Sequence, residues 1–263
     1  MDQFPRFFSV DSAKAIKAQS FGWLNAINYM APHKAGGVGN LCSHASPGCI
    51  ALCLGLWSGQ AGMRAEGETN LVVDSRVRKA QYFMRERNAY MVEMLRHIAR
   101  LYRYAKRNGL KLAVRPNGST DIAYESIRVM VTPELASELT RITGHEIAAG
   151  VHTIFSAFPW IQFVDYTKNP NRFARALPKN YSLTFSRSEI NDSQAINLLN
   201  LGVNVAVVFA ETLPKRWNGF RVINGDKHDL RHLDPKGGVV VGLLPKGRKA
   251  KRDSSGFVTR LAA

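Results

Sequence analysis

Residues 191–209 read NDSQAINLLNLGVNVAVVF, and this run indicates the fold class of the chain. Its first part, 191–201, predicts a helix that Gly202 closes, because a glycine commonly follows the last helical turn. Its second part, 203–209, is an apolar run, which predicts a strand buried on both faces. A helix that leads directly into such a strand is typical of a parallel sheet covered by helices.

The same alternation of strand and helix continues on both sides of this run. The remaining strands are predicted at 23–30, 111–115, 160–166, 181–185, 220–223 and 239–244, and the remaining helices at 77–107 and from Thr132-Pro133-Glu134 onward. Together they predict an α/β fold with a mostly parallel sheet, arranged as a partial TIM-like (βα)5–6 barrel. We expect a single domain over residues 1–263, with a peripheral N-terminal segment, 1–20, and a basic C-terminal tail, 245–263.

The chain combines a large positive charge with ordinary hydrophobicity. Its formal net charge is +16, and 45% of its residues are hydrophobic. The charge is concentrated at 76–107 and 246–252 and predicts a nucleic acid or another anionic partner, although such runs are more often solvated surface. The chain has no run of about 18 apolar residues and no signal-peptide pattern, so we expect a cytoplasmic protein without a membrane partner.

All three cysteines of the chain, Cys42, Cys49 and Cys53, lie in one short segment after the first predicted strand. Cys49 and Cys53 are four residues apart and would share a helix face. Pro47-Gly48 bends the chain, so that Cys42 can reach the other two. This arrangement favours a ligand that the three thiols share.

Three thiolates fit a [4Fe-4S] cluster that leaves one iron free of cysteine, because soft sulfur ligands favour iron–sulfur clusters and zinc over hard cations. Two other interpretations stay open. One is a zinc site with His44 as the fourth ligand, and the other is a set of three buried thiols without a metal. The odd number of cysteines argues against a disulfide framework and favours a reducing compartment.

Polar residues follow several of the predicted strands, at the point where each strand ends. Ligands of parallel α/β folds bind at the carboxyl ends of the strands, so we expect these residues to form a ligand site beside the cysteine segment. Asp121 and Glu189 have an alternative role as helix caps, and Lys168 as an exposed turn residue. The candidate ligand-binding residues are Asn117, Ser119, Asp121, Lys168, Ser186 and Arg187.

A late segment, 224–238, concentrates the carboxylates Asp226, Asp229 and Asp234 with two histidines. Such a cluster is able to bind a divalent metal or to supply acid and base groups, as in a metal-dependent nuclease. A surface loop rich in turn-forming residues has the same composition. The chain contains no P-loop, no dinucleotide fingerprint and no nucleophile elbow.

With its cysteine segment after the first strand, the chain resembles the radical S-adenosylmethionine (SAM) enzymes in layout. The resemblance implies a [4Fe-4S] cluster whose fourth iron binds SAM, and it implies that Asp121 pairs with the SAM ammonium group. The chain departs from that family in two respects. Six residues separate Cys42 from Cys49 and three separate Cys49 from Cys53, which is wider than the family spacing, and no Gly-Gly-Glu motif is present.

A closer resemblance is to uncharacterised proteins of phages and plasmids. It rests on the segment 40–53, the turn 115–121, the strand end Tyr166-Thr167-Lys168, and a late Asp-rich segment that ends in Lys246-Gly247. It implies an iron–sulfur protein of mobile-element origin that works in the host cell cytoplasm. It implies no particular reaction.

The function expected from these features is that of an iron–sulfur protein with radical-SAM-like or redox activity and an external electron donor. No motif indicates its substrate, and whether the chain is an enzyme stays open. The alternative is a basic nucleic-acid-binding protein in which the cysteines hold a structural cluster or zinc.

Overall fold

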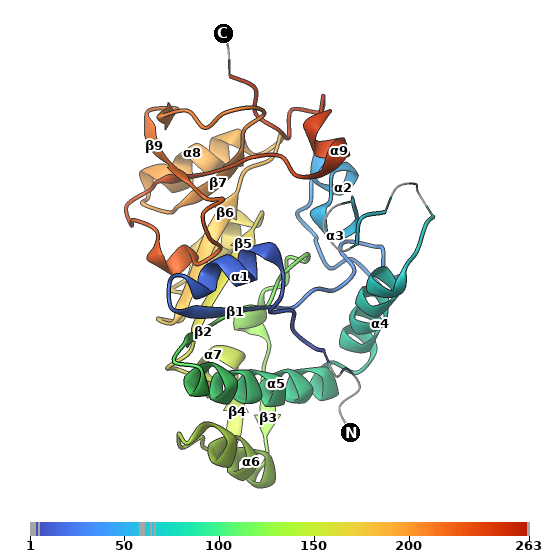
Figure 1. Cartoon of the computed structure of the whole chain (residues 1–263), viewed down its shortest axis with the longest axis vertical. Helices are drawn as coiled ribbons and strands as arrows, with labels where there is room; N and C mark the ends of the chain where they lie inside the picture. Colours follow the sequence, from blue (N-terminus) through green and yellow to red (C-terminus); the bar gives the residue numbers. More distant parts are fainter. Residues whose placement is uncertain (1–3, 5, 58–60, 64, 66, 262–263) are drawn as a thin grey trace.

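The computed structural model describes residues 4, 6–57, 61–63, 65 and 67–261, and its centre is an eight-stranded sheet (Figure 1). The strand order is β1-β2-β5-β6-β7-β10-β9-β8. All neighbouring strands are parallel except β8 and β9, so the expected α/β class with a mostly parallel sheet is confirmed. The strands are β1 (Trp23–Ile27), β2 (Lys111–Arg115), β5 (Gln162–Thr167), β6 (Tyr181–Ser186), β7 (Val205–Val208), β8 (Arg216–Trp217), β9 (Phe220–Asn224) and β10 (Val240–Leu243).

The first five strands of the sheet follow the chain order, as in a TIM-like arrangement, and β1 and β8 form the two open edges. A separate hairpin of β3 (Val129–Val131) and β4 (Gly150–His152) brackets α6 (Pro133–Thr143) below the sheet (Figure 1). The other helices are α1 (Ala13–Gln19), α2 (Pro47–Ala51), α3 (Leu54–Trp57), α4 (Leu71–Arg85), α5 (Arg87–Arg107), α7 (Ile154–Ala157), α8 (Asp192–Asn200) and α9 (Gly247–Lys251).

The larger hydrophobic core lies between α5 and the strands β1, β2 and β5. Met94 and Ile98 of α5 are fully buried and belong to the same core as Val114 and Phe163. Burying one such side chain stabilises the fold by about 1.5–3 kcal/mol. The sequence predicts one helix over 77–107, but the chain forms two, because Glu86 between them has φ −131° and ψ 52°.

The smaller core confirms the prediction made from residues 191–209. α8 ends at Asn200, and Gly202 follows with φ +82°, a conformation that glycine adopts without strain. Leu198 of α8 then packs with Val205 and Val207 of β7. This helix and strand therefore form the unit that their apolar pattern indicates.

The opposite face of the sheet is covered by α1 and by the segment between β9 and β10. Ala18 of α1 and Leu230 contact Ala113, whose side chain points away from α5 because strand residues alternate between faces. The N-terminal segment was expected to be peripheral, yet Phe7 and Phe8 are buried in the core. None of the helices in the described part of the chain is long and apolar enough to cross a membrane.

Candidate functional site

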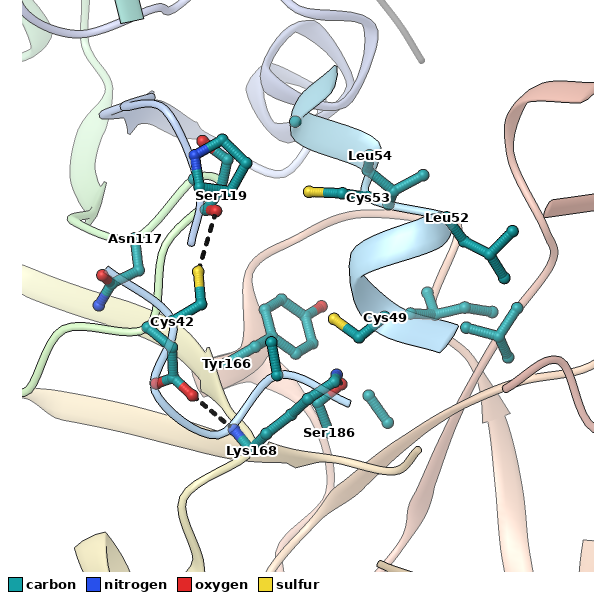
Figure 2. Close-up of a pocket in the computed structure, with 18 of the residues that line it drawn as sticks. Cys42, Cys49, Leu52, Cys53, Leu54, Asn117, Ser119, Tyr166, Lys168 and Ser186 are labelled. Atoms are coloured by element: carbon teal, nitrogen blue, oxygen red, sulfur yellow. Dashed lines mark hydrogen bonds between the residues drawn. The ribbon is translucent and has the colours of Figure 1, made fainter. Parts of the chain in front are cut away.

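A cavity of about 240 Å³ lies where the parallel strands end. Its wall contains all three cysteines from the connection between β1 and α4, and residues at or after the carboxyl ends of the sheet strands (Figure 2). The strand-end residues on the wall include Arg115, Asn117, Ser119, Asp121, Lys168, Ser186, Val208 and Leu244. The structure therefore brings together the cysteines and five of the six predicted ligand-binding residues.

The three cysteines reach the cavity from different positions around α2. Cys42 precedes this helix, Cys49 lies within it, and Cys53 lies in the break between α2 and α3. The prediction that Cys49 and Cys53 share one helix face is therefore wrong, because α2 ends at Ala51. All three are free and half-buried thiols, and Figure 2 shows their sulfurs directed into the same space.

Backbone groups surround the buried sulfurs. The His33 N–H donates to Cys42 Sγ at 3.3 Å, and Cys42 Sγ lies 3.7 Å from the Ser119 carbonyl oxygen, to which it donates. The pKa of Cys42 is raised to about 12, mainly by burial, with smaller contributions from the negative charges of Cys53, Asp121 and Cys49. Burial also raises the pKa of Cys53 to about 11. These thiols stay protonated at neutral pH unless a soft metal displaces the proton.

The arrangement of donors does not support a single-ion zinc site. A zinc ion holds its sulfur ligands at about 2.3 Å, so all four donors must meet around one point. Among the described residues, no three His, Cys, Asp or Glu side chains are placed to hold a metal ion. His44, the fourth ligand in the zinc interpretation, hydrogen-bonds Ser43 Oγ at 2.9 Å and is not part of the cavity wall.

The turn after β2 is held in shape by the buried amide of Asn117. Its Nδ2 donates to Asp165 Oδ2 at 2.7 Å, and its Oδ1 accepts the Ile122 N–H at 2.9 Å. The neighbouring Ser119 Oγ donates to the Met30 carbonyl at 2.6 Å. Both side chains hydrogen-bond to other parts of the protein, so they hold the cavity wall in shape.

Asp121, Lys168 and Ser186 are linked by hydrogen bonds and form a polar part of the cavity wall. The Asp121 carboxylate accepts the Lys168 N–H at 2.8 Å and an Arg172 Nη1 hydrogen bond at 3.1 Å. Lys168 Nζ donates to Ser186 Oγ at 2.7 Å and lies 5.2 Å from the centre of the Phe257 ring. An ammonium group has three donors, so Lys168 is able to bind a further acceptor in the cavity.

Arg187, the sixth predicted ligand-binding residue, is not part of the cavity wall. Its Nη1 donates to the carbonyl oxygens of Gly256 and Phe257, at 2.5 and 3.0 Å, and its Nε donates to Asp192 at 2.6 Å. Arg187 therefore anchors the C-terminal segment, and Phe257 of this segment forms part of the cavity wall. The tail is therefore packed against the fold.

Glu189 holds the cysteine segment in place. The sequence suggests a helix cap near Asn191, but Oε1 of Glu189 accepts the Gly48 N–H at 2.7 Å and Oε2 accepts the Ser46 hydroxyl at 2.8 Å. Ser46 is also the N-cap of α2 and accepts the Cys49 N–H. Sequence reasoning missed this anchor, since Ser46-Pro47 signals a helix start but nothing in the sequence points to its distant partner.

The carboxylates of the late segment are paired with separate cations. Asp226 lies 3.2 Å from Lys246, Asp229 lies 3.4 Å from Arg115, and Asp234 lies 3.2 Å from Arg231. Their distribution does not support the interpretation as a metal-dependent nuclease, which needs carboxylates that converge on a metal. Asp226 and Asp229 form part of the cavity wall as members of ion pairs.

A family model described as gene product 88 matches residues 7–261. The matched region includes every residue of the cavity wall, and the match fits a phage-type protein, as the sequence resemblance predicts. No curated protein and no solved structure matches the chain.

Proposed function

The chain belongs to the gene product 88 family, and we propose that it is an iron–sulfur protein in which Cys42, Cys49 and Cys53 hold one [4Fe-4S] cluster. The observation that carries the proposal is that all three sulfurs point into one cavity at the strand ends (Figure 2). In such a cluster each cysteine binds a different iron, so the sulfurs surround the group and do not meet at one point. Three thiols spread around a cavity fit this requirement better than they fit a single ion.

The surroundings of the cysteines support a cluster. The backbone N–H of His33 donates to Cys42 Sγ, and hydrogen bonds to sulfur are one of the means by which proteins set the reduction potential of a cluster. Leu52, Leu54 and Phe257 supply apolar surface to the cavity wall and restrict the access of water. Free thiols in this setting also fit the reducing cytoplasm of a host cell.

We assign the activity to the radical-SAM-like or redox class, with an external electron donor. When bound, the cluster supplies one-electron chemistry and, at the iron without a cysteine, a coordination position. Lys168 would hold an anionic group of the ligand through its free donors, and Asp121 would accept a cationic group such as the SAM ammonium. The pairing of Asp121 with Arg172 fixes the direction of its carboxylate.

Iron and sulfide analysis after anaerobic purification tests the cluster. We expect iron and sulfide in equal amounts, a brown colour, and loss of both in Cys49→Ala. Ser43→Ala is the matched control, because Ser43 lies in the same loop but outside the cavity wall, and it should keep the full iron content. A colourless wild-type protein with stoichiometric zinc, or with no metal, would rule the proposal out.

Electron paramagnetic resonance of the reduced protein, with and without SAM, separates the two activity classes. A spectrum that changes on addition of SAM supports binding at the open iron. An unchanged spectrum excludes the radical-SAM-like reaction and leaves the redox class. Lys168→Met should leave the iron content intact while it weakens the response to ligand.

A further inference from the structure

A second and larger hollow, of about 1070 Å³, adjoins the cysteine cavity. We call it the basic groove. The two share Leu54, Gly55, Arg115, Gly118, Asp229 and Lys246 as wall residues, so the cysteine cavity opens beside the groove. One side of the groove is formed by α9, which packs against α3, a helix almost 200 residues earlier in the chain (Figure 1).

The wall of the basic groove is strongly positive. Its described cations outnumber its described carboxylates by six to two. Arg248 and Arg252 of the α9 region are exposed, and neither makes a side-chain hydrogen bond or ion pair within the described part of the chain. Their charge is therefore available to an anionic partner. The six cations are Arg76, Arg115, Lys246, Arg248, Lys249 and Arg252.

Two aromatic rings of the groove wall each contact one of these cations. The Arg76 guanidinium lies 4.7 Å from the centre of the Tyr29 ring, and Lys249 Nζ lies 3.0 Å from the centre of the Trp57 ring. Tyr29 and Trp57 both belong to the groove wall. A positive groove with aromatic side chains is the arrangement that binds single-stranded nucleic acid, where cations follow the backbone and bases stack on rings.

We infer that the basic groove binds the phosphate backbone of a single-stranded nucleic acid and places a nucleotide at the opening of the cysteine cavity. The exposed cations of the α9 region, Arg248, Lys249 and Arg252, meet the phosphates of the strand. Arg76 is buried and Arg115 is paired with Asp229, so these two only add positive potential to the wall. The net charge of +16 adds a long-range attraction for any nucleic acid. This inference deepens the proposed function by naming its substrate class. The role of the nucleic acid as a substrate rests on the proposed function. The binding of the strand rests on the groove alone.

Fluorescence anisotropy with labelled single-stranded DNA and RNA oligonucleotides tests the groove. The double variant Arg248→Glu/Arg252→Glu should weaken binding at least about tenfold and reduce the slope of log affinity against log salt by about 0.7 for each lost phosphate contact. The matched control is Lys106→Glu/Arg107→Glu, which makes the same change of charge at the exposed end of α5, outside the groove. Both double variants lower the net charge by the same amount and so lose the same long-range attraction for the strand. Beyond this shared loss, the control should change the affinity by less than about twofold.

Competition assays define the partner. Unlabelled single strands should displace the probe more effectively than duplexes of the same length, and a nucleoside triphosphate or inorganic phosphate should compete only weakly. Four outcomes would each overturn the inference. Two concern the variants: the two double variants weaken binding equally, or the groove variant does not weaken it. The other two concern the competitors: duplex binds better than single strands, or a free nucleotide competes fully. Arg248→Gln/Arg252→Gln provides a second variant that removes the charge without reversing it.

Iron and sulfide analysis on the same preparations separates this inference from the proposed function. A preparation that contains the cluster but binds strands independently of Arg248 and Arg252 overturns only the inference about the basic groove. A preparation without iron that still binds strands through these residues overturns the cluster alone, together with the substrate role.

Discussion

Glu189 accepts the backbone N–H of Gly48 at 2.7 Å, and this bond joins the loop after β6 to the first turn of α2. The same carboxylate accepts the Ser46 hydroxyl, whose oxygen caps the helix that carries Cys49. A residue 140 positions away in the chain thus determines where one of the three thiols lies. The cysteine segment is held from outside, because its own helices span only five and four residues.

Glu189→Ala should therefore destabilise the cysteine segment. The variant loses two hydrogen bonds to a charged group, each of which contributes about 1.5–3 kcal/mol, but Glu189 is only half-buried and water offsets part of this. We therefore expect a net loss of about 2–3 kcal/mol in the free energy of unfolding, measured by urea denaturation. Iron content after reconstitution should fall as well. Glu146→Ala, at an exposed position, is the control and should change stability by less than about 0.5 kcal/mol. Equal stability of the two variants would show that the bond is dispensable.

Gly118→Ala should distort the turn that carries Asn117 and Ser119. A Cβ atom at this position would lie 2.6 Å from the Asn28 carbonyl oxygen. Asn28 is fully buried directly after β1, so its backbone cannot move away easily. We expect a loss of at least about 2 kcal/mol by urea denaturation, in the range of overpacked sites. Gly109→Ala is the comparison, because Gly109 has φ +67° and open space around it, and only the backbone cost of about 1 kcal/mol applies. A smaller loss at Gly118 than at Gly109 would contradict the crowding argument.

Much of the fold could be predicted because strands and helices leave periodic apolar patterns. The predicted strand 181–185 corresponds to β6, and the start signal at Thr132 corresponds to the N-cap of α6. The break at Glu86 could not be predicted, since the apolar period continues through it from α4 to α5. The hairpin of β3 and β4 was also missed, because three-residue strands are too short to show an alternating pattern.

The candidate site was accessible from the sequence only where a general rule applies. Polar residues at the carboxyl ends of parallel strands share one edge of the sheet, which is why Ser119, Asp121 and Lys168 lie on the same cavity wall as the cysteines. The roles of Glu189 and Arg187 depend on contacts with segments about 70 to 140 residues away. No local pattern encodes such a contact, so a single sequence does not reveal it.

Arg187→Ala should release the C-terminal segment without unfolding the sheet. The variant loses two hydrogen bonds to backbone carbonyls and the ion pair with Asp192. We expect faster amide hydrogen exchange for residues 253–259 and a loss of about 2 kcal/mol in the free energy of unfolding. Arg216→Ala, which removes one exposed hydrogen bond to Gly219, should leave the exchange of that segment unchanged. Unaltered exchange in the Arg187 variant would exclude the anchoring role.

Asp165, buried beneath the turn after β2, should make stability depend on pH. Burial raises the pKa of its carboxyl to about 7, although Arg115, Arg172 and the bonds from Asn117 favour the ionised form. An ordinary aspartate has a pKa near about 3.9 in the unfolded chain, so between about pH 4 and pH 7 the folded state binds the extra proton. This residue's contribution to the free energy of unfolding therefore decreases as pH rises through that window, by at most about 1.4 kcal/mol per pH unit.

Urea denaturation of the wild type and of Asp165→Asn separates the contribution of Asp165 from that of the other carboxylates. The measurements are made at several pH values between about 4.5 and 8, which cover the window between the two pKa values. The stability difference between wild type and variant should shrink as pH rises, because only the wild type loses the bound proton. Asp192→Asn, which replaces an exposed carboxylate in the ion pair with Arg187, is the control for the loss of one negative charge outside the buried site. A difference between wild type and Asp165→Asn that grows with pH would mean that the Asn117 amide and the two arginines outweigh burial, and that Asp165 is ionised throughout.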